Sequence, residues 1–493
     1  MTEETHTHLL PACRRQRLAL LVLVSLHAMV ALTMLLSQVR PPQIDVAQAG
    51  IPELTKLTNL LTSLVYWQYL PGWALLAVLS AVAWGHLRHA RARHVPPDRR
   101  ERVARRYRRT LVTTLLALPA LKIPSLLDVA VWPRAHALAF LLCLPTTLYA
   151  LWLVHHLQRF RRVPVPLLLT AAGWGAVIAT GFGLTMNEWW KSFSTLHFPL
   201  PENTLDVTRL KDTGLPMVSG FFEELGKGAG VAILFLLHRR HFDSVVSGVV
   251  VGAATGLGFN FAESVTYMAA FDGSSAGFHF WARQVAGLMA AHAAFTAVTG
   301  AAFGIARQLR SRSQQLTTIA LGLCAAASAH FCNNAMLDYL AKESHKWFTA
   351  DDTFDVLVLT PAQLLLFQGP SVVLYVLLLR RGLRSEAGGL RVALTTLPPA
   401  SRDAITEQEA AVLLSPARRF RLKVDALRAG ENPRRGLTAY RRLARLHAAQ
   451  LDLATERWHS LRGEADPYAP DEASSRARVQ AIKAVLAAPK DCR

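Results

Sequence analysis

The sequence predicts an all-α, polytopic membrane protein with about ten spans and a helical C-terminal tail on the cytoplasmic side. Of the 493 residues, 52% are hydrophobic and only 18% are charged, and the mean hydropathy is +0.24. Apolar runs long enough to cross a bilayer recur over roughly the first 380 residues, and no such run follows them. Clusters of basic residues separate these runs, as the positive-inside rule expects of cytoplasmic loops. This pattern excludes a soluble enzyme.

We divide the chain into three regions on this basis. Residues 1–213 form an N-terminal transmembrane region of about five spans. Residues 214–380 form a second transmembrane region, also of about five spans, which contains most of the membrane-embedded polar residues. Residues 381–493 are polar and rich in Ala, Arg and Leu, and we expect them to form a basic helical tail.

The first span is expected at about 18–38. Arg14, Arg15 and Arg17 precede it, and no small-x-small cleavage site follows before Arg40. We therefore interpret this segment as a signal anchor that stays in the protein.

Four further spans are expected in the first region, at about 71–87, 111–132, 135–157 and 165–186. The arginine-rich loop 88–109 is the strongest cytoplasmic marker in the chain. The 111–132 segment contains two charged residues and two prolines. It must nevertheless cross, because the basic residues after 157 belong on the same side as that loop. The polar segment 187–214 is then expected to be an outside loop.

Five spans are expected in the second region, at about 215–237, 245–270, 283–306, 316–340 and 361–379. Basic residues follow the first, third and fifth of these spans, whereas acidic residues follow the fourth. Ten crossings satisfy this distribution, and both termini are then cytoplasmic. Glycines along 245–270 predict that a neighbouring helix packs closely against this span.

The basic composition predicts contact with lipid and not with nucleic acid. The formal net charge is +20, but in a membrane protein Lys and Arg first mark cytoplasmic loops near anionic lipid. The five cysteines form no CxxC pair and support neither a disulfide framework nor a zinc knuckle. In the tail, helices are expected at Pro416–Leu427, after a Ser415 cap, and at Arg434–Leu461. Their basic faces fit a solvated surface or, alternatively, a membrane-surface or regulatory segment.

Three ionisable residues, Glu223, Glu224 and Lys227, lie inside the apolar span 215–237. Each such group costs about 2.5–3.5 kcal/mol at the centre of a membrane helix, so an unpaired trio would cost about 8–10 kcal/mol. Such residues therefore need ion-pairing partners or a functional role. Later spans carry complementary groups, namely Glu263, His292, and His330 with Asn334.

The predicted topology places these polar groups at one depth, in the outer half of the bilayer. At about 1.5 Å per residue, Glu223 and Glu224 lie roughly 12–14 Å below the outer face, level with the groups of the three other spans. Lys227 can pair with either glutamate at i,i+4 or i,i+3 spacing. Adjacent glutamates point about 100° apart, so only one of them can face a given pocket. We expect one to act on water and the other to brace it.

Carboxylates and imidazoles together in a dry site are suited to activating water. One reading is a metal-free mechanism in which a glutamate is the general base and His or Asn donates to an oxyanion. A second reading is a zinc ion held by Glu263, His292 and His330, with a free glutamate as base. The same residues also fit a proton- or ion-coupled transporter or a non-catalytic sensing scaffold. A transporter, however, predicts charges spread along a path and inverted repeats, and the sequence has neither.

The order Glu223-Glu224-x-x-Lys227, Phe259-x-x-x-Glu263, His292 and His330-x-x-x-Asn334 resembles the PrsW-type intramembrane proteases. These are relatives of the CAAX prenyl endopeptidases and bacteriocin-processing membrane proteases. The resemblance covers about 214–338 and makes 214–380 the expected catalytic core. It implies a hydrolase of the bacterial cytoplasmic membrane that cleaves a membrane-anchored protein, such as an anti-sigma factor, on its extracytoplasmic side.

The resemblance also assigns roles to the residues. It implies that Glu223 and Glu224 are the paired catalytic glutamates and Glu263 a further acid. It also implies that His292 and His330 are the essential histidines, with Asn334 as oxyanion partner. It leaves metal use open, because the family includes members described as metalloproteases and members described as glutamic proteases. The N-terminal spans, the basic loop and the tail lie outside the motifs.

Overall fold

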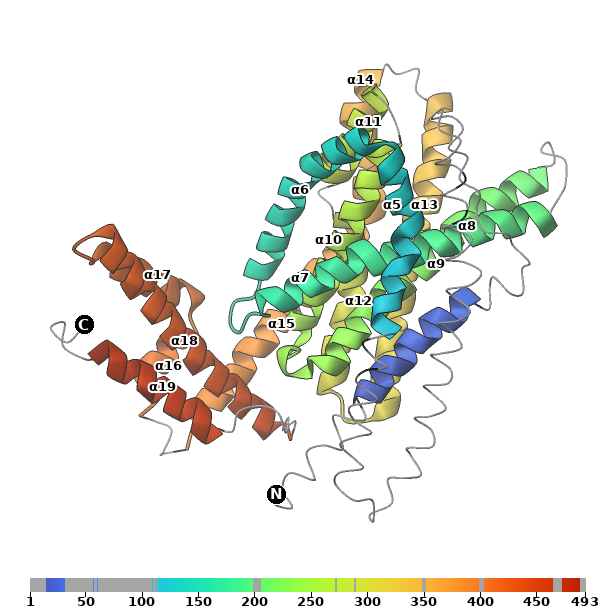
Figure 1. The fold of residues 1–493 in the computed structure, drawn as a ribbon. Helices are drawn as coiled ribbons and strands as arrows, with labels where there is room; N and C mark the ends of the chain where they lie inside the picture. Colours follow the sequence, from blue (N-terminus) through green and yellow to red (C-terminus); the bar gives the residue numbers. More distant parts are fainter. Residues whose placement is uncertain are drawn as a thin grey trace, which may run out of the picture.

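The computed structural model describes residues 15–31, 114–197, 205–270, 273–287, 290–347, 352–398, 403–463 and 472–487, with four single positions between 56 and 112. Every regular element in these ranges is helical, which confirms the all-α class (Figure 1). The expected span at 71–87 and nearly all of the loop 88–109 lie outside the described residues.

Helix α10 (Val245–Ala269) occupies the centre of the helical bundle, and 89% of its apolar stretch is buried inside the protein. Its buried valines and alanines pack against α7 (Val165–Gly173) and α12 (Ala290–Gln308). Ser244 caps its N-terminus and accepts from the Val246 N–H. Glycines on α10 allow α12 to approach closely, because a Cβ at position 256 would lie 2.1 Å from the His292 carbonyl oxygen. The predicted close packing at this span is confirmed.

The first region contributes the elements on one side of α10. In chain order they are a helix at 15–31, η3 (Leu118–Lys122), α5 (Ile123–Val131), α6 (Pro133–His156), α7, the π-helix η4 (Trp174–Ala179) and α8 (Thr180–His197). The expected outside loop at 187–214 was wrong over 187–197, where α8 continues, and over 205–214, where the next helix has already begun. The rings of Trp189 and Phe193 stack at i,i+4 spacing with centroids 5.4 Å apart, which supports helix in this polar stretch.

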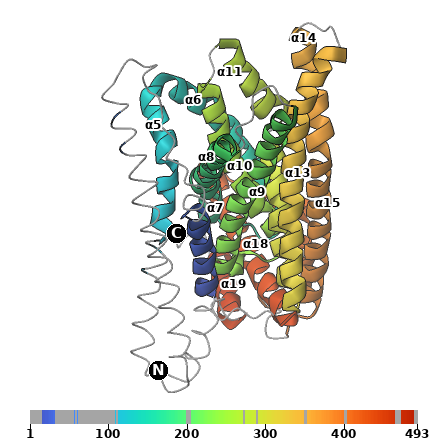
Figure 2. The same ribbon diagram turned by 90° about the vertical axis from the view of Figure 1, so that its right-hand side faces the viewer.

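The second region begins with α9 (Leu205–Leu237) and the short turn η5 (Arg239–His241). After α10 come α11 (Gly273–Phe280), the π-helix η6 (Trp281–Ala286), α12 and α13 (Arg312–Trp347). The single span expected at 283–306 is broken, because η6 ends at Ala286, α12 begins at Ala290, and the two helical parts meet at 45°. α14 (Asp352–Phe354), the π-helix η7 (Asp355–Leu359) and α15 (Thr360–Thr395) follow, and α15 runs beside α13 (Figure 2).

Five described helices are long and apolar enough to cross a membrane, or six if the bent pair around Gly287 forms one span. The five are Pro133–His156, Val165–Lys191, Val245–Ala269, Arg312–Met336 and Asp355–Thr395. α9 is not among them, because Glu223, Glu224 and Lys227 interrupt its apolar run. Exposed leucines on α15, such as Leu365 at 75%, fit a surface that faces lipid. The chain is an integral membrane protein, but a count of about ten spans is not confirmed among the described residues.

The C-terminal domain contains α16 (Glu407–Leu413), α17 (Pro416–Arg428), α18 (Pro433–Leu461) and α19 (Glu472–Ala487), at the lower left of Figure 1. Ser415 accepts from the Arg418 N–H, which confirms the predicted cap. The last turns of α15 belong to this domain, since Leu390 and Leu394 pack in its core with Leu413 and Leu453. α15 therefore runs without a break across the boundary that we predicted at 380, and the division into regions stays a prediction.

Asp243 fastens the C-terminal domain to the turn between α9 and α10. Its carboxylate accepts from Arg161 Nη1 at 3.0 Å and from His459 Nε2 of α18 at 2.9 Å. Burial alone would raise the pKa of the Asp243 carboxyl, but Arg161, His459 and Arg307 together hold it below its usual range. The turn joining the two helices that bear Glu223 and Glu263 is thus tied to the C-terminal domain.

Asp243→Asn should loosen this attachment by about 2 kcal/mol, because hydrogen bonds to a charged group are lost. A carboxyl whose pKa is lowered on folding stabilises the protein fully above its unfolded pKa of about 3.9, and the contribution disappears as the pH falls below that value. Hydrogen exchange of α18 should therefore accelerate in the variant near pH 7, and less so at the lowest workable pH. Asp425→Asn, at an exposed carboxylate of α17, is the control; equal acceleration in both variants would contradict the role of Asp243.

Candidate functional site

Three helices bring five of the predicted residues into one buried cluster. α9 supplies Glu223, Glu224 and Lys227, and α13 supplies His330. Glu224 and Lys227 are fully buried, and Glu223 and His330 are 5% and 1% exposed. His292 of α12 joins them, with its ring centroid 4.9 Å from that of His330. The convergence expected from the sequence is therefore observed for these residues.

Glu224 has its hydrogen-bonding capacity taken up by neighbouring side chains. Its Oε1 lies 2.7 Å from Lys227 Nζ and 3.2 Å from His330 Nδ1. Its Oε2 accepts from Thr296 Oγ1 of α12 at 3.0 Å. Three helices are thereby joined through one carboxylate, as expected of a structural brace.

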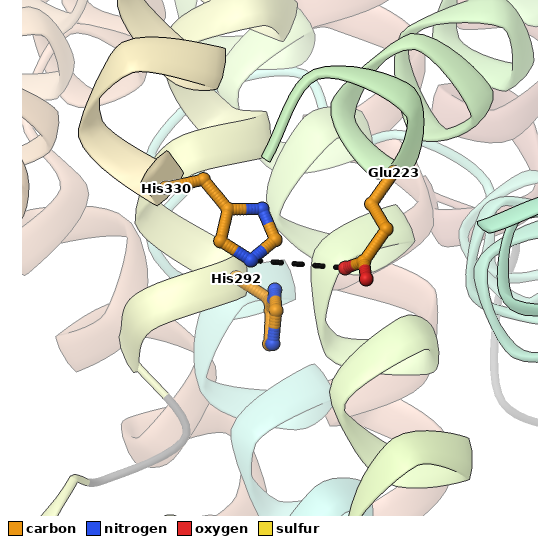
Figure 3. Close-up of side chains that lie close together, drawn as sticks. All are labelled: Glu223, His292 and His330. Atoms are coloured by element: carbon orange, nitrogen blue, oxygen red, sulfur yellow. Dashed lines mark ion pairs between the residues drawn. The ribbon is translucent and has the colours of Figure 1, made fainter. Parts of the chain in front are cut away.

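Glu223 has one oxygen that no described side chain satisfies. Its Oε1 accepts from Asn187 Nδ2 of α8 at 3.1 Å. Its Oε2 is buried without a hydrogen-bond partner among the described residues, 3.7 Å from both His330 Nε2 and Lys227 Nζ. Figure 3 shows the Glu223 carboxylate and the His330 ring directed at each other, with His292 beside them. The distances leave Glu223 available to a small group placed between these side chains.

A second line of contacts runs from Lys227 through His292 to Glu263. Lys227 Nζ lies 3.0 Å from His292 Nδ1, and His292 Nε2 lies 2.7 Å from Glu263 Oε2. Arg283 of η6 donates to the same Glu263 oxygen at 2.8 Å. Since Lys227 donates to Nδ1, the neutral His292 ring carries its proton on Nε2 and donates to Glu263. Glu263 therefore fixes the orientation of His292 from behind.

Asn334 lies one helical turn beyond His330 but makes different contacts. Its Nδ2 donates to Ser219 Oγ at 3.3 Å, and its Oδ1 accepts from Asn333. No described contact joins it to the glutamates or histidines. Its role at an oxyanion stays a prediction.

Close helix packing sets the position of the Glu223 side chain. A Cβ at position 183 of α8 would lie only 2.7 Å from Glu223 Cγ. Glycine at this position therefore leaves the space that the side chain occupies. Trp174 of η4 also holds α9, because its Nε1 donates to the Gly226 carbonyl at 2.9 Å.

Ligand atoms of Glu223, His292 and His330 lie within 4.8 Å of one another, which suits a shared metal ion. This group differs from the predicted set in its carboxylate, since Glu263 contacts His292 and Arg283 instead. The unpartnered Glu223 Oε2 and two imidazoles form a donor set that zinc accepts. Glu263 behind His292 also matches the carboxylate partner that metal-ligating histidines commonly have.

Three polar contacts of the cluster were missed by the sequence analysis. Asn187 lies in the stretch that was expected to be a loop, and Arg283 was counted as the end of a span. Thr296 follows His292 by four residues and therefore shares its helix face. That spacing is a signal that could have found it.

Comparison with known families finds a match within the membrane core. Residues 163–366 match the PrsW family intramembrane metalloprotease model. The match confirms the resemblance predicted from the motifs, and it supports a peptide hydrolase. The PrsW match also extends beyond 214–338 to include α7, η4 and α8, and with them Asn187. No curated protein and no solved structure matches the chain.

Proposed function

We propose that this protein hydrolyses a peptide bond of a membrane-anchored protein substrate with water activated by Glu223. The observation that carries this proposal is the buried Glu223 Oε2, which has no described partner and lies 3.7 Å from His330 Nε2 and Lys227 Nζ. A water molecule between these groups would be oriented by a carboxylate and by nitrogen donors. The PrsW match supports the same class of reaction.

The residues divide the chemistry among themselves. Glu223 takes a proton from a water molecule while the oxygen of that water forms a bond to the scissile carbonyl carbon. Lys227 and His330 stabilise the developing oxyanion, and Asn334 adds a donor when its amide turns from Ser219. When the C–N bond breaks, Glu223 returns the proton to the leaving nitrogen. Glu224 holds Lys227 and His330 in place throughout.

The same donors fit a divalent metal ion such as zinc. Glu223, His292 and His330 would hold it, and Glu263 would orient His292. When bound, the ion supplies Lewis-acid chemistry that polarises the substrate carbonyl. The metalloprotease description of the matching family supports this version of the site.

We further propose that the site lies in the outer half of the bilayer and acts on a substrate resembling an anti-sigma factor. The depth rests on the topology predicted from the sequence, in which the basic loops and both termini are cytoplasmic. The substrate class rests on the resemblance to PrsW-type proteases. The rival transporter role is less well supported, because the charged side chains form one compact cluster and not a path.

The test is reconstitution of the full chain in liposomes with a single-span reporter protein. We expect cleavage of the reporter near its outer membrane boundary, and no proton or cation flux across the same liposomes. A chelator should reduce cleavage, and zinc should restore it. Flux without cleavage would overturn the peptidase, whereas cleavage that chelation leaves unchanged would overturn only the metal.

A further inference from the structure

A cationic cluster lies where the C-terminal domain contacts the turn between α6 and α7, separate from the Glu/His site. Arg419 of α17 donates to the Arg159 carbonyl, and its guanidinium lies 5.5 Å from the centroid of the Phe160 ring. Lys423, one turn further along α17, lies 5.5 Å from the ring centroid of Tyr440 on α18. The cluster thus joins the membrane region to the C-terminal domain.

Positive charges in this cluster act on one another. Burial lowers the pKa of Arg419 to about 10, and the charge of Arg162 lowers it as well. The pKa of Lys423 is lowered mainly by burial and further by the charges of Arg162 and Arg419. The pKa of His447 is lowered to about 4, mainly by burial and further by the charges of Arg419 and Lys423. These effects indicate cations held close together without matching anions.

The acid that acts on this cluster is already engaged with another cation. Glu409, which acts on His447, pairs with Lys483 at 2.7 Å. The described carboxylates therefore leave the positive charge of the cluster in excess.

Two nitrogen atoms of the cluster are buried without a described hydrogen-bond partner. Arg419 is 8% exposed and its Nε has no acceptor, although a guanidinium N–H can only donate. His447 is also 8% exposed, and its Nδ1 has no partner. Buried polar groups in folded proteins are nearly always hydrogen-bonded, so these atoms point to an additional ligand.

We propose that Arg162, Arg419 and Lys423 bind the phosphate headgroup of an anionic membrane lipid. Guanidinium groups bind phosphate through paired N–H donors, and Lys adds a point charge. Arg162 lies between the candidate spans Pro133–His156 and Val165–Lys191, which places the cluster at the membrane boundary. The exposed Phe420 on the same helix provides an apolar surface for acyl chains. The lipid would then clamp the C-terminal domain to the membrane region.

The test uses the full chain in detergent and native mass spectrometry. The probes are phosphatidylglycerol, phosphatidylcholine and inorganic phosphate. The test variant combines Arg162→Gln with Lys423→Gln and leaves the buried Arg419 in place, so that the domain contact is kept. The control combines Arg428→Gln with Arg434→Gln, which removes the same charge from exposed positions of α17 and α18 outside the cluster.

We expect phosphatidylglycerol to bind more tightly than phosphatidylcholine, and the test variant to lose about tenfold or more of this affinity. The control should change by less than about threefold. An equal loss of phosphatidylglycerol affinity in both variants would show that the lipid is attracted to the basic surface in general, and would overturn the proposed site. Loss of inorganic phosphate binding, with phosphatidylglycerol binding unchanged, would overturn the lipid as its ligand.

Discussion

Glu223→Gln should lower the rate of reporter cleavage by about 10²–10⁴-fold, the usual contribution of a general base. The substitution preserves the shape of the side chain and keeps an oxygen that can accept from Asn187 at 3.1 Å. It removes the charge at the carboxylate oxygen that has no described partner. Stability should therefore change less than in Glu224→Gln, because Glu224 still pairs with Lys227 and the Asn187 contact remains.

The matched control is Glu188→Gln on α8, a carboxylate that pairs with Lys191 outside the cluster. It should leave cleavage within about twofold of the unmodified protein, as expected of a surface ion pair. Rates are measured on reconstituted protein with the single-span reporter, and thermal unfolding is measured on the same preparations. Near-normal cleavage by Glu223→Gln would remove Glu223 as the base and reopen the choice between the two glutamates.

Much of the fold could be predicted because its signals are local. The cap at Ser415 and the apolar run after Val245 correspond to helices that begin at Pro416 and Val245. The break at Gly287 and the helical continuation past Asn187 depend on contacts that local sequence does not encode. Trp189 and Phe193 favour helix through their stacking, although the composition around them is typical of a loop.

The cluster could be predicted because charges in an apolar helix are costly and require partners. Spacing could not decide which glutamate is braced, since Lys227 can reach both of them. The structure distinguishes them through Thr296 and Asn187, neutral side chains that more often serve as helix contacts than as parts of a site. Glu263 shows the same limit, because only tertiary packing places Arg283 and His292 on its carboxylate.

Glu224 and Lys227 should have the largest effect on stability. Both side chains are fully buried and lie 2.7 Å apart. Removing one partner of a buried ion pair leaves an uncompensated charge, at a cost of about 3–5 kcal/mol. Glu224→Gln and Lys227→Met should each destabilise the protein by about that amount. The double variant should cost less than the sum, because removing both charges leaves neither of them buried without its partner.

Glu188 and Lys191 form the control pair for this cycle, because they have the same i,i+3 spacing and lie 2.6 Å apart. Their side chains are 32% and 54% exposed, so water screens the charges and the coupling should be about 0–1 kcal/mol. Unfolding in mixed detergent micelles measures both cycles. Coupling of similar size in the two pairs would contradict a dry, structural role for Glu224. A large coupling in the buried pair, together with a much smaller loss of stability in Glu223→Gln, would separate the brace at Glu224 from the base at Glu223.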